Sequence, residues 1–238
     1  MGAITPINPS YHDLRRFFSD PEIKELLDYK ILDPLYDAWE RKVVGTETSY
    51  LTRVLLQSGI DPLEQLSDIP AGFLAANPFI ERVVIPEGVN LIGKSAFAGG
   101  GALSAIILPS SLQFINSRAF LCCFNLSYIK LPPSVVYLGE HAFEESGLIQ
   151  IDLKDCSIKS LPYQCFYKCR HLKKISLPKC MTKLSIDTFS ACPKLTDIEF
   201  GGTRKEFVAL AQTDVSLRRY PNVTLTCSDG VYTLKDIL

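Results

Sequence analysis

Apolar residues recur along the chain with a period of about 23 residues, starting near Leu66 and ending at Phe200. Other columns of apolar residues run in phase with a column of phenylalanine. The phenylalanine column is Phe97, Phe120, Phe143, Phe166 and Phe189. Two more columns, separated by one residue, are Val83, Ile106, Ile129, Ile151, Ile175, Ile198 and Ile85, Leu108, Leu131, Leu153, Leu177, Phe200. One residue is missing between Phe143 and Leu148 and one is gained near Ser157, so the period recovers.

A fixed period of this length predicts a solenoid in which each turn is one supersecondary unit. A single unit cannot bury its apolar face, so neighbouring turns supply the core to one another. The run apolar–x–apolar–Pro predicts a short strand in every turn, because side chains two apart share a face and proline ends the ladder. A second strand or turn then carries Val89 and Ile92, and residues 96–103 are expected to form a tight turn or a short helix.

The repeated motif reads apolar–x–Leu–Pro, then Ile–Gly, then Ala–Phe, then Leu, and IILPSSLQFINSRAFLCCFNL is one variant copy. This pattern resembles the BspA-like (treponemal-type) leucine-rich repeats over about residues 66–235. The resemblance implies an α/β fold, a right-handed leucine-rich-repeat solenoid with a capped end. Members of this family act as interaction modules in bacterial and protist surface proteins and in phage and intracellular proteins. The resemblance therefore predicts the fold more closely than the biological role.

Three regions are expected: a helical domain or cap over 1–65, repeats over 66–200, and a C-terminal cap over 201–238. Helices are expected at about 10–18, 21–30, 34–44 and 48–58, and Asp–Pro pairs place an N-cap before the first-turn proline of the second and third of them. The helical region either covers the apolar end of the first turn or forms a second functional domain. A degenerate first turn carries Leu66, Ile69, Leu74 and Ile80, with Asn77 placed to bond backbone groups of adjacent turns.

The segment 201–238 predicts a helix followed by a hairpin. Thr203 is a suitable N-cap for a short helix that carries Phe207, and the hairpin is expected to turn at Asp229–Gly230. The segment also resembles the C-terminal cap of the family, in which a tryptophan is usual where Phe207 stands.

The charge balance gives no electrostatic sign of a nucleic-acid or membrane partner. The chain holds 25 basic and 26 acidic residues, a net charge of −1, and 47% hydrophobic residues. The N-terminus has no apolar leader and no run approaches 18 apolar residues, so a cytoplasmic protein is expected. A surface location would follow if a leader had been removed.

No catalytic, metal or cofactor site is predicted, and an enzyme is the least supported class. The eight cysteines follow the repeat: Cys123, Cys169 and Cys192 share one small, inward-facing column and are expected to be free buried thiols. Zinc bound by Cys165, Cys169 and His171 is not favoured, because their spacing is not a zinc signature. Cys156 and Cys180 occupy equivalent places in adjacent turns and would be able to pair in an oxidising compartment.

The residues that alternate with the buried strand columns are expected to face outward on a concave sheet surface. These candidate partner-binding residues are Arg82, Val84, Ile107, Tyr128, Lys130, Gln150, Asp152, Lys174 and Ser176. Val84, Ile107 and Tyr128 form an interaction patch, or else Val84 and Ile107 lie under the N-terminal helices and Tyr128 remains a central outward position with Lys130, Gln150 and Asp152.

The predicted function is non-catalytic binding of an unidentified partner protein through this face. The chain would then be a bacterial or phage-encoded protein that holds or blocks a host factor. A surface adhesin fragment and a structural subunit that docks through its N-terminal helices are the alternatives.

Overall fold

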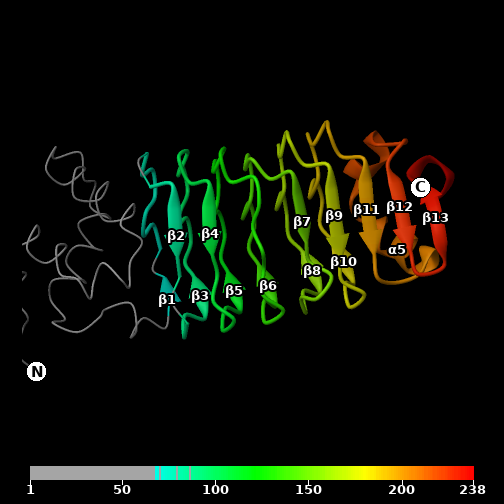
Figure 1. The fold of residues 1–238 in the computed structure, drawn as a ribbon. Helices are drawn as coiled ribbons and strands as arrows, with labels where there is room; N and C mark the ends of the chain where they lie inside the picture. The colour runs from blue at the N-terminus through cyan, green and yellow to red at the C-terminus, as the bar shows by residue number, and fades with distance from the viewer. Residues whose placement is uncertain (1–67, 70, 79, 86) are drawn as a thin grey trace, which may run out of the picture.

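A computed structural model describes residues 68–69, 71–78, 80–85 and 87–238 (Figure 1). The helices expected between residues 10 and 58, the proposed domain over 1–65, and Leu66 of the degenerate first turn lie outside the described residues. The rest of the chain forms a β-solenoid of about seven turns that are stacked side by side along one axis (Figure 1).

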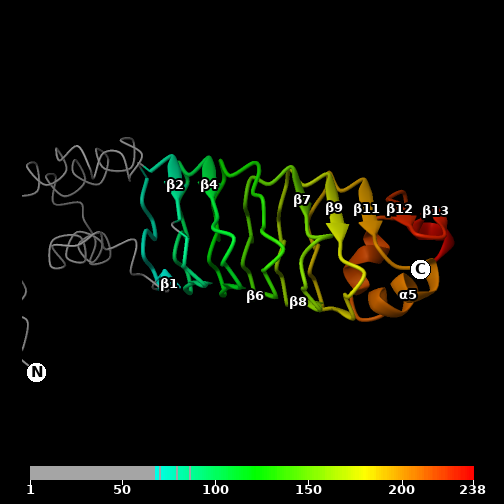
Figure 2. The same cartoon turned by 60° about the horizontal axis from the view of Figure 1, so that its bottom comes forward.

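Two rows of short strands lie on opposite sides of the solenoid (Figure 2). One row contains β2 (Arg82–Val84), β4 (Ala105–Ile107), β7 (Gln150–Asp152), β9 (Lys174–Leu177) and β11 (Asp197–Phe200). The other contains β1 (Asp68–Ile69), β3 (Leu91–Ile92), β5 (Phe114–Ile115), β6 (Tyr137–Leu138), β8 (Ser160–Leu161) and β10 (Lys183–Leu184).

Neighbouring turns pair in parallel and in register with the apolar columns. Val83 lies opposite Ile106 in the pair β2–β4, and Ile151, Ile175 and Ile198 align across β7, β9 and β11. All five residues are buried. The predicted one-unit-per-turn stacking is therefore confirmed at the level of individual residues.

The expected strand is missing from one turn. Residues 128–130 occupy the place between β4 and β7 but form no strand, so this row is divided into a two-stranded and a five-stranded sheet. Ile129 and Leu131 are nevertheless 1% and 6% exposed. Side-chain packing thus keeps this turn in place on a face where the backbone ladder is interrupted.

The phenylalanine column forms a continuous stack through the core. The five rings lie 5.3, 5.2, 5.6 and 5.9 Å apart between centroids, with interplanar angles of 4–8°. In the first turn Leu74 takes the column position, and Phe73 meets Phe97 edge-on at 6.3 Å. Asn77 is buried in that turn, and its Oδ1 accepts a hydrogen bond from the Ile80 amide within the same turn.

The segment that begins each phenylalanine turn is a series of tight turns and not a helix. Each of these segments contains two positions with positive φ. The first position has φ values of 53–60° and is occupied in successive turns by Ser95, Arg118, His141, Gln164 and Asp187. Such a conformation costs a non-glycine residue about 1–2 kcal/mol. Inter-turn bonds hold it, because the amides of Phe97, Phe120 and Phe143 donate to carbonyls of the next turn at 2.8–2.9 Å.

The C-terminal residues add one helix and a hairpin to the last turn. Helix α5 (Arg204–Ala211) begins with a capping box between Thr203 and Glu206 and buries Phe207 against Phe200, with ring centroids 5.8 Å apart. Strand β12 (Thr224–Cys227) extends the sheet in parallel from β11, and β13 (Gly230–Thr233) pairs with it antiparallel. A short 3₁₀ helix over Val215–Arg219 links α5 to β12, and another spans Leu234–Asp236.

Two details at this end differ from the prediction or extend it. The hairpin turns at Ser228–Asp229, because Gly230 already pairs with Cys227. The Tyr220 hydroxyl donates to the Phe189 carbonyl and accepts from the Cys192 amide, both at 2.8 Å. It thereby satisfies backbone groups of the last phenylalanine turn, for which no further turn exists.

Candidate protein-binding surface

The outward side of the row from β2 to β11, called the strand face below, carries an apolar patch at its N-terminal end. The patch consists of Val84, Ile107 and Tyr128, with 36%, 55% and 54% of their surfaces exposed. Val84 and Ile107 are register partners in β2 and β4, and Tyr128 comes from the next turn, where the ladder is interrupted. Arg82 and Lys130 are exposed at the margin of the patch.

The other end of the strand face is covered with ion pairs. Lys174 Nζ lies 2.6 Å from Glu199 Oε1, and Lys154 Nζ lies 3.2 Å from Asp152 Oδ2. The hydrogen bond from Lys174 is the largest influence that lowers the pKa of Glu199, followed by that from Ser176. These four charges already have partners of opposite sign, so this end is less suited to binding than the apolar end.

The prediction that Ser176 is exposed on the strand face is wrong. Ser176 is only 5% exposed, because its hydroxyl donates to Glu199 Oε2 at 2.7 Å and the neighbouring side chains cover it. Gln150 and Asp152 are exposed and Lys174 is half-buried, as their outward positions require. The binding role of the remaining residues stays a prediction.

Two exposed features of the surface were not predicted from the sequence. Phe114 and Tyr137 are 37% and 44% exposed on the second row of strands, where they are register partners in β5 and β6. Because Phe114 and Tyr137 occupy equivalent places in successive repeats, the sequence contained a signal from which this exposed aromatic pair could have been predicted. The second feature is an exposed ring, Phe124 (57%), at one wall of a cleft.

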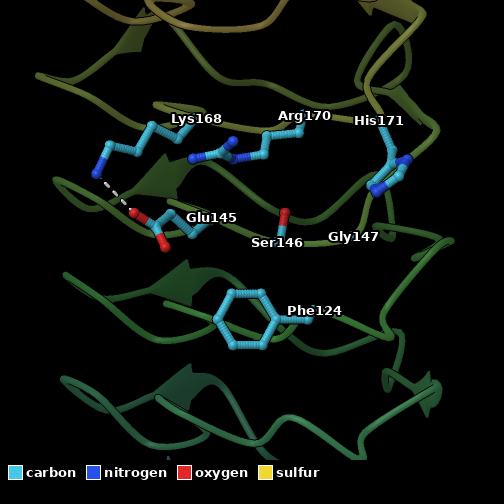
Figure 3. A pocket seen from close by; sticks show the side chains of 7 residues that line it. All are labelled: Phe124, Glu145, Ser146, Gly147, Lys168, Arg170 and His171. Atoms are coloured by element: carbon cyan, nitrogen blue, oxygen red, sulfur yellow. Dashed lines mark hydrogen bonds and ion pairs between the residues drawn. The ribbon is translucent and has the colours of Figure 1, made fainter.

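This cleft, called the lateral cleft, has a volume of about 100 Å³ and lies between three successive turns (Figure 3). Its lining residues are Phe124, Glu145, Ser146, Gly147, Lys168, Arg170 and His171. Lys168 Nζ lies 2.7 Å from Glu145 Oε1, and this hydrogen bond is the main reason that the pKa of Lys168 is raised. The residue missing between Phe143 and Leu148 was the sequence signal for this irregularity.

Comparisons with known proteins agree with this geometry. The model of the BspA-type leucine-rich repeat region matches residues 90–211 in six copies, which is half of the chain. The chain belongs to the BspA-type leucine-rich-repeat family. Repeats of this kind generally mediate protein–protein interaction or adhesion, and their solenoid is typically a non-catalytic scaffold. None of the curated proteins gives a significant match.

Two solved structures resemble this BspA-type solenoid. A leucine-rich-repeat protein of T. pallidum is 26% identical, with a TM-score of 0.54 over 68% of this chain and 76% of the other. The pneumococcal vaccine antigen PcpA is 20% identical, with a TM-score of 0.55 over 71% of this chain and 40% of the antigen. The second likeness concerns the fold alone.

The cysteines of the BspA-type repeats are free thiols, as predicted. Cys123, Cys165, Cys169 and Cys192 are completely buried. Burial is the largest cause that raises the pKa of both Cys123 and Cys169 to about 12. Among the described residues, no group of three or more His, Cys, Asp or Glu side chains is placed to hold a metal ion. In the same part of the chain, no helix is long and apolar enough to cross a membrane.

Native alkylation is expected to modify Cys180 first, because it is exposed while burial raises the pKa of Cys156 to about 11. Iodoacetamide followed by peptide mass spectrometry would measure this, and Cys180→Ser should remove the first adduct.

Cys180 Sγ lies 3.7 Å from the Cys156 carbonyl oxygen, so the two residues are neighbours, and no disulfide joins them in the structure. Intact mass with and without reductant tests whether oxidising conditions join them, and early labelling of Cys123 or Cys169 would contradict the buried assignment.

Proposed function

We propose that this protein is a non-catalytic binding module that holds a partner protein on the apolar patch of the strand face. The observation that carries the proposal is the combination of Val84, Ile107 and Tyr128 in adjacent turns, each at least one-third exposed. Exposed apolar side chains that adjoin one another and are rimmed by charge are typical of interaction sites. Tyrosine is a frequent binding hot spot, since its ring buries a large area and its hydroxyl still finds a hydrogen-bond partner.

The rest of the strand face suits an accessory role. Lys154 is paired with Asp152 and Lys174 with Glu199, so a partner would gain little by replacing those contacts. The side chains of the patch are apolar or aromatic, so a partner does not have to replace ion pairs in order to contact them. The bound partner is therefore expected to centre on Tyr128 and Ile107, with Arg82 and Lys130 at the polar rim.

The double substitution Ile107→Asp and Tyr128→Ala is expected to abolish detectable partner binding. Removing one hot spot costs about 2 kcal/mol or more, which corresponds to a loss of roughly 30-fold or more in affinity. The melting temperature should change little, because both side chains are more than half exposed. Affinity capture with mass spectrometry would identify the partner, and titration calorimetry with purified proteins would measure the loss.

The chain offers a matched control in Tyr163→Ala with Ile186→Asp. These residues are 41% and 56% exposed, also occupy equivalent places in adjacent turns, and are remote in sequence from the patch. Full binding by the control and none by the patch variant would support the proposal. Unchanged binding by the patch variant would reject this face as the site, and a homo-oligomer in light scattering without any partner would favour a structural subunit.

A further inference from the structure

The lateral cleft exists because one turn of the solenoid is shorter than its neighbours. In the turns before and after it, two residues with side chains follow the inward-facing cysteine: Phe124–Asn125 and Arg170–His171. The turn between them has only Gly147 at this place. The space that two side chains would fill is therefore left open between the Phe124 ring and the Arg170 side chain (Figure 3).

Backbone contacts fix the position of the short turn. The Gly147 amide donates to the Cys123 carbonyl and the Ile149 amide to the Ser127 carbonyl, both at 3.0 Å. These bonds draw the short turn toward the preceding one. The phenylalanine rings agree, since Phe143 lies 5.2 Å from Phe120 but 5.6 Å from Phe166. The opening thus faces the turn that carries Arg170.

The charge inside the cleft is positive. Glu145 is already neutralised by Lys168 at 2.7 Å. Arg170 is exposed and makes no hydrogen bond or ion pair within the described part of the chain. Two further lysines are exposed nearby. Lys173 is three residues from Arg170 in the sequence, and Lys194 is in the next turn, where its Nζ lies 3.5 Å from His171 Nδ1. An anion entering the cleft would therefore meet an unpaired guanidinium and no uncompensated carboxylate.

We propose that the lateral cleft binds a carboxylate side chain of a partner polypeptide, with Arg170 as the charged donor and the Phe124 ring as the apolar wall. An arginine fork matches the two oxygens of a carboxylate, and the ring packs against the methylene groups of an acidic side chain. A volume of about 100 Å³ equals roughly three water molecules, which suits one short side chain.

The position of the cleft favours a polypeptide over a free anion. Its residues Gly147 and Arg170 directly precede the segments that enter β7 and β9, so the cleft adjoins the edge of the strand face. A protein that contacts this edge can insert an acidic side chain while its neighbouring residues contact the surrounding lysines. This inference goes beyond the function proposed above, because the cleft would bind a carboxylate whether or not the apolar patch is the main contact.

The test uses the full chain, labelled with ¹⁵N, and two blocked tetrapeptides that differ only in a central glutamate or glutamine between glycines. At constant ionic strength, the glutamate peptide is expected to shift the Arg170 side-chain and Gly147 backbone signals in a saturable manner. The glutamine peptide should bind at least about tenfold more weakly, as measured by the dissociation constant fitted to the same signals, since the charge-assisted bond is worth about 1.5 kcal/mol or more. Arg170→Gln should remove the response.

Arg118→Gln is the matched control, because Arg118 is also an exposed arginine and its column already carries glutamine at Gln164. This variant should respond like the unchanged protein. Equal responses to both peptides, or an undiminished response in Arg170→Gln, would overturn the assignment of the carboxylate to Arg170. Saturation by acetate at the same concentration as the glutamate peptide would overturn the polypeptide as the occupant and show a site for small free anions.

Discussion

Phe143→Ala is expected to lower the free energy of unfolding by about 3–5 kcal/mol, the range for truncating a large buried aromatic side chain. The Phe143 ring is completely buried and stacks on both sides, at 5.2 Å on Phe120 and 5.6 Å on Phe166. The substitution removes two aromatic contacts and leaves a cavity between turns. Because each turn of a solenoid is stabilised by its neighbours, the loss weakens both interfaces of the turn.

Urea denaturation followed by circular dichroism would measure this change, and amide exchange in residues 140–148 would show whether it is local. Phe124→Ala is the matched control, since its ring is 57% exposed and outside the stack. That variant should stay within about 0.5 kcal/mol of the unchanged protein. A loss below about 1 kcal/mol for Phe143→Ala would mean that the stack contributes little and that the backbone ladders hold the turns together.

The sequence predicted the buried phenylalanine column because its signal is periodic and local. A phenylalanine at the same place in successive repeats can be buried in every turn only if the turns superpose. The same reasoning placed Ile151 and Ile175 opposite each other in β7 and β9. It also recovered the Thr203 cap, since capping depends on residues only three positions apart.

The tight turns were harder to predict, because tertiary contacts override local preference there. Arg118 and His141 adopt positive φ values of 60° and 58°, although neither is glycine. Arginine has no preference for this conformation, and histidine adopts it more often than most residues but still uncommonly. The amides of the same turns bond to the next turn, and a regular series of such bonds outweighs the local strain.

Burial on the strand face also depends on neighbours that the alternation of residues does not describe. Ser176 occupies an outward position, yet the pair between Lys174 and Glu199 covers it. The lateral cleft was missed for a similar reason. The missing residue near Gly147 was visible in the sequence, but its consequence depends on Phe124 and Arg170 in two other turns.

Gly147→Ala is expected to destabilise the protein by about 3 kcal/mol or more, through overpacking against a backbone that cannot move aside. A Cβ atom at this position would lie 2.0 Å from the Phe124 carbonyl oxygen and 2.8 Å from its carbon. Relief requires the short turn to move away, which breaks the 3.0 Å bond from the Gly147 amide to the Cys123 carbonyl. Thermal and urea unfolding of the purified variant would measure the loss.

Gly101→Ala separates this effect from the general influence of glycine on the unfolded chain. Gly101 lies in the turn before Phe124, and a Cβ atom there would meet only the Phe124 ring, at an ordinary 3.8 Å. Both substitutions reduce the freedom of the unfolded chain equally, so the difference between them reports the close approach alone. If the two variants had equal stability, the short turn would be able to shift along the solenoid axis. The lateral cleft would then be adjustable in width, whereas a large difference shows that the missing residue fixes the cleft rigidly in the fold.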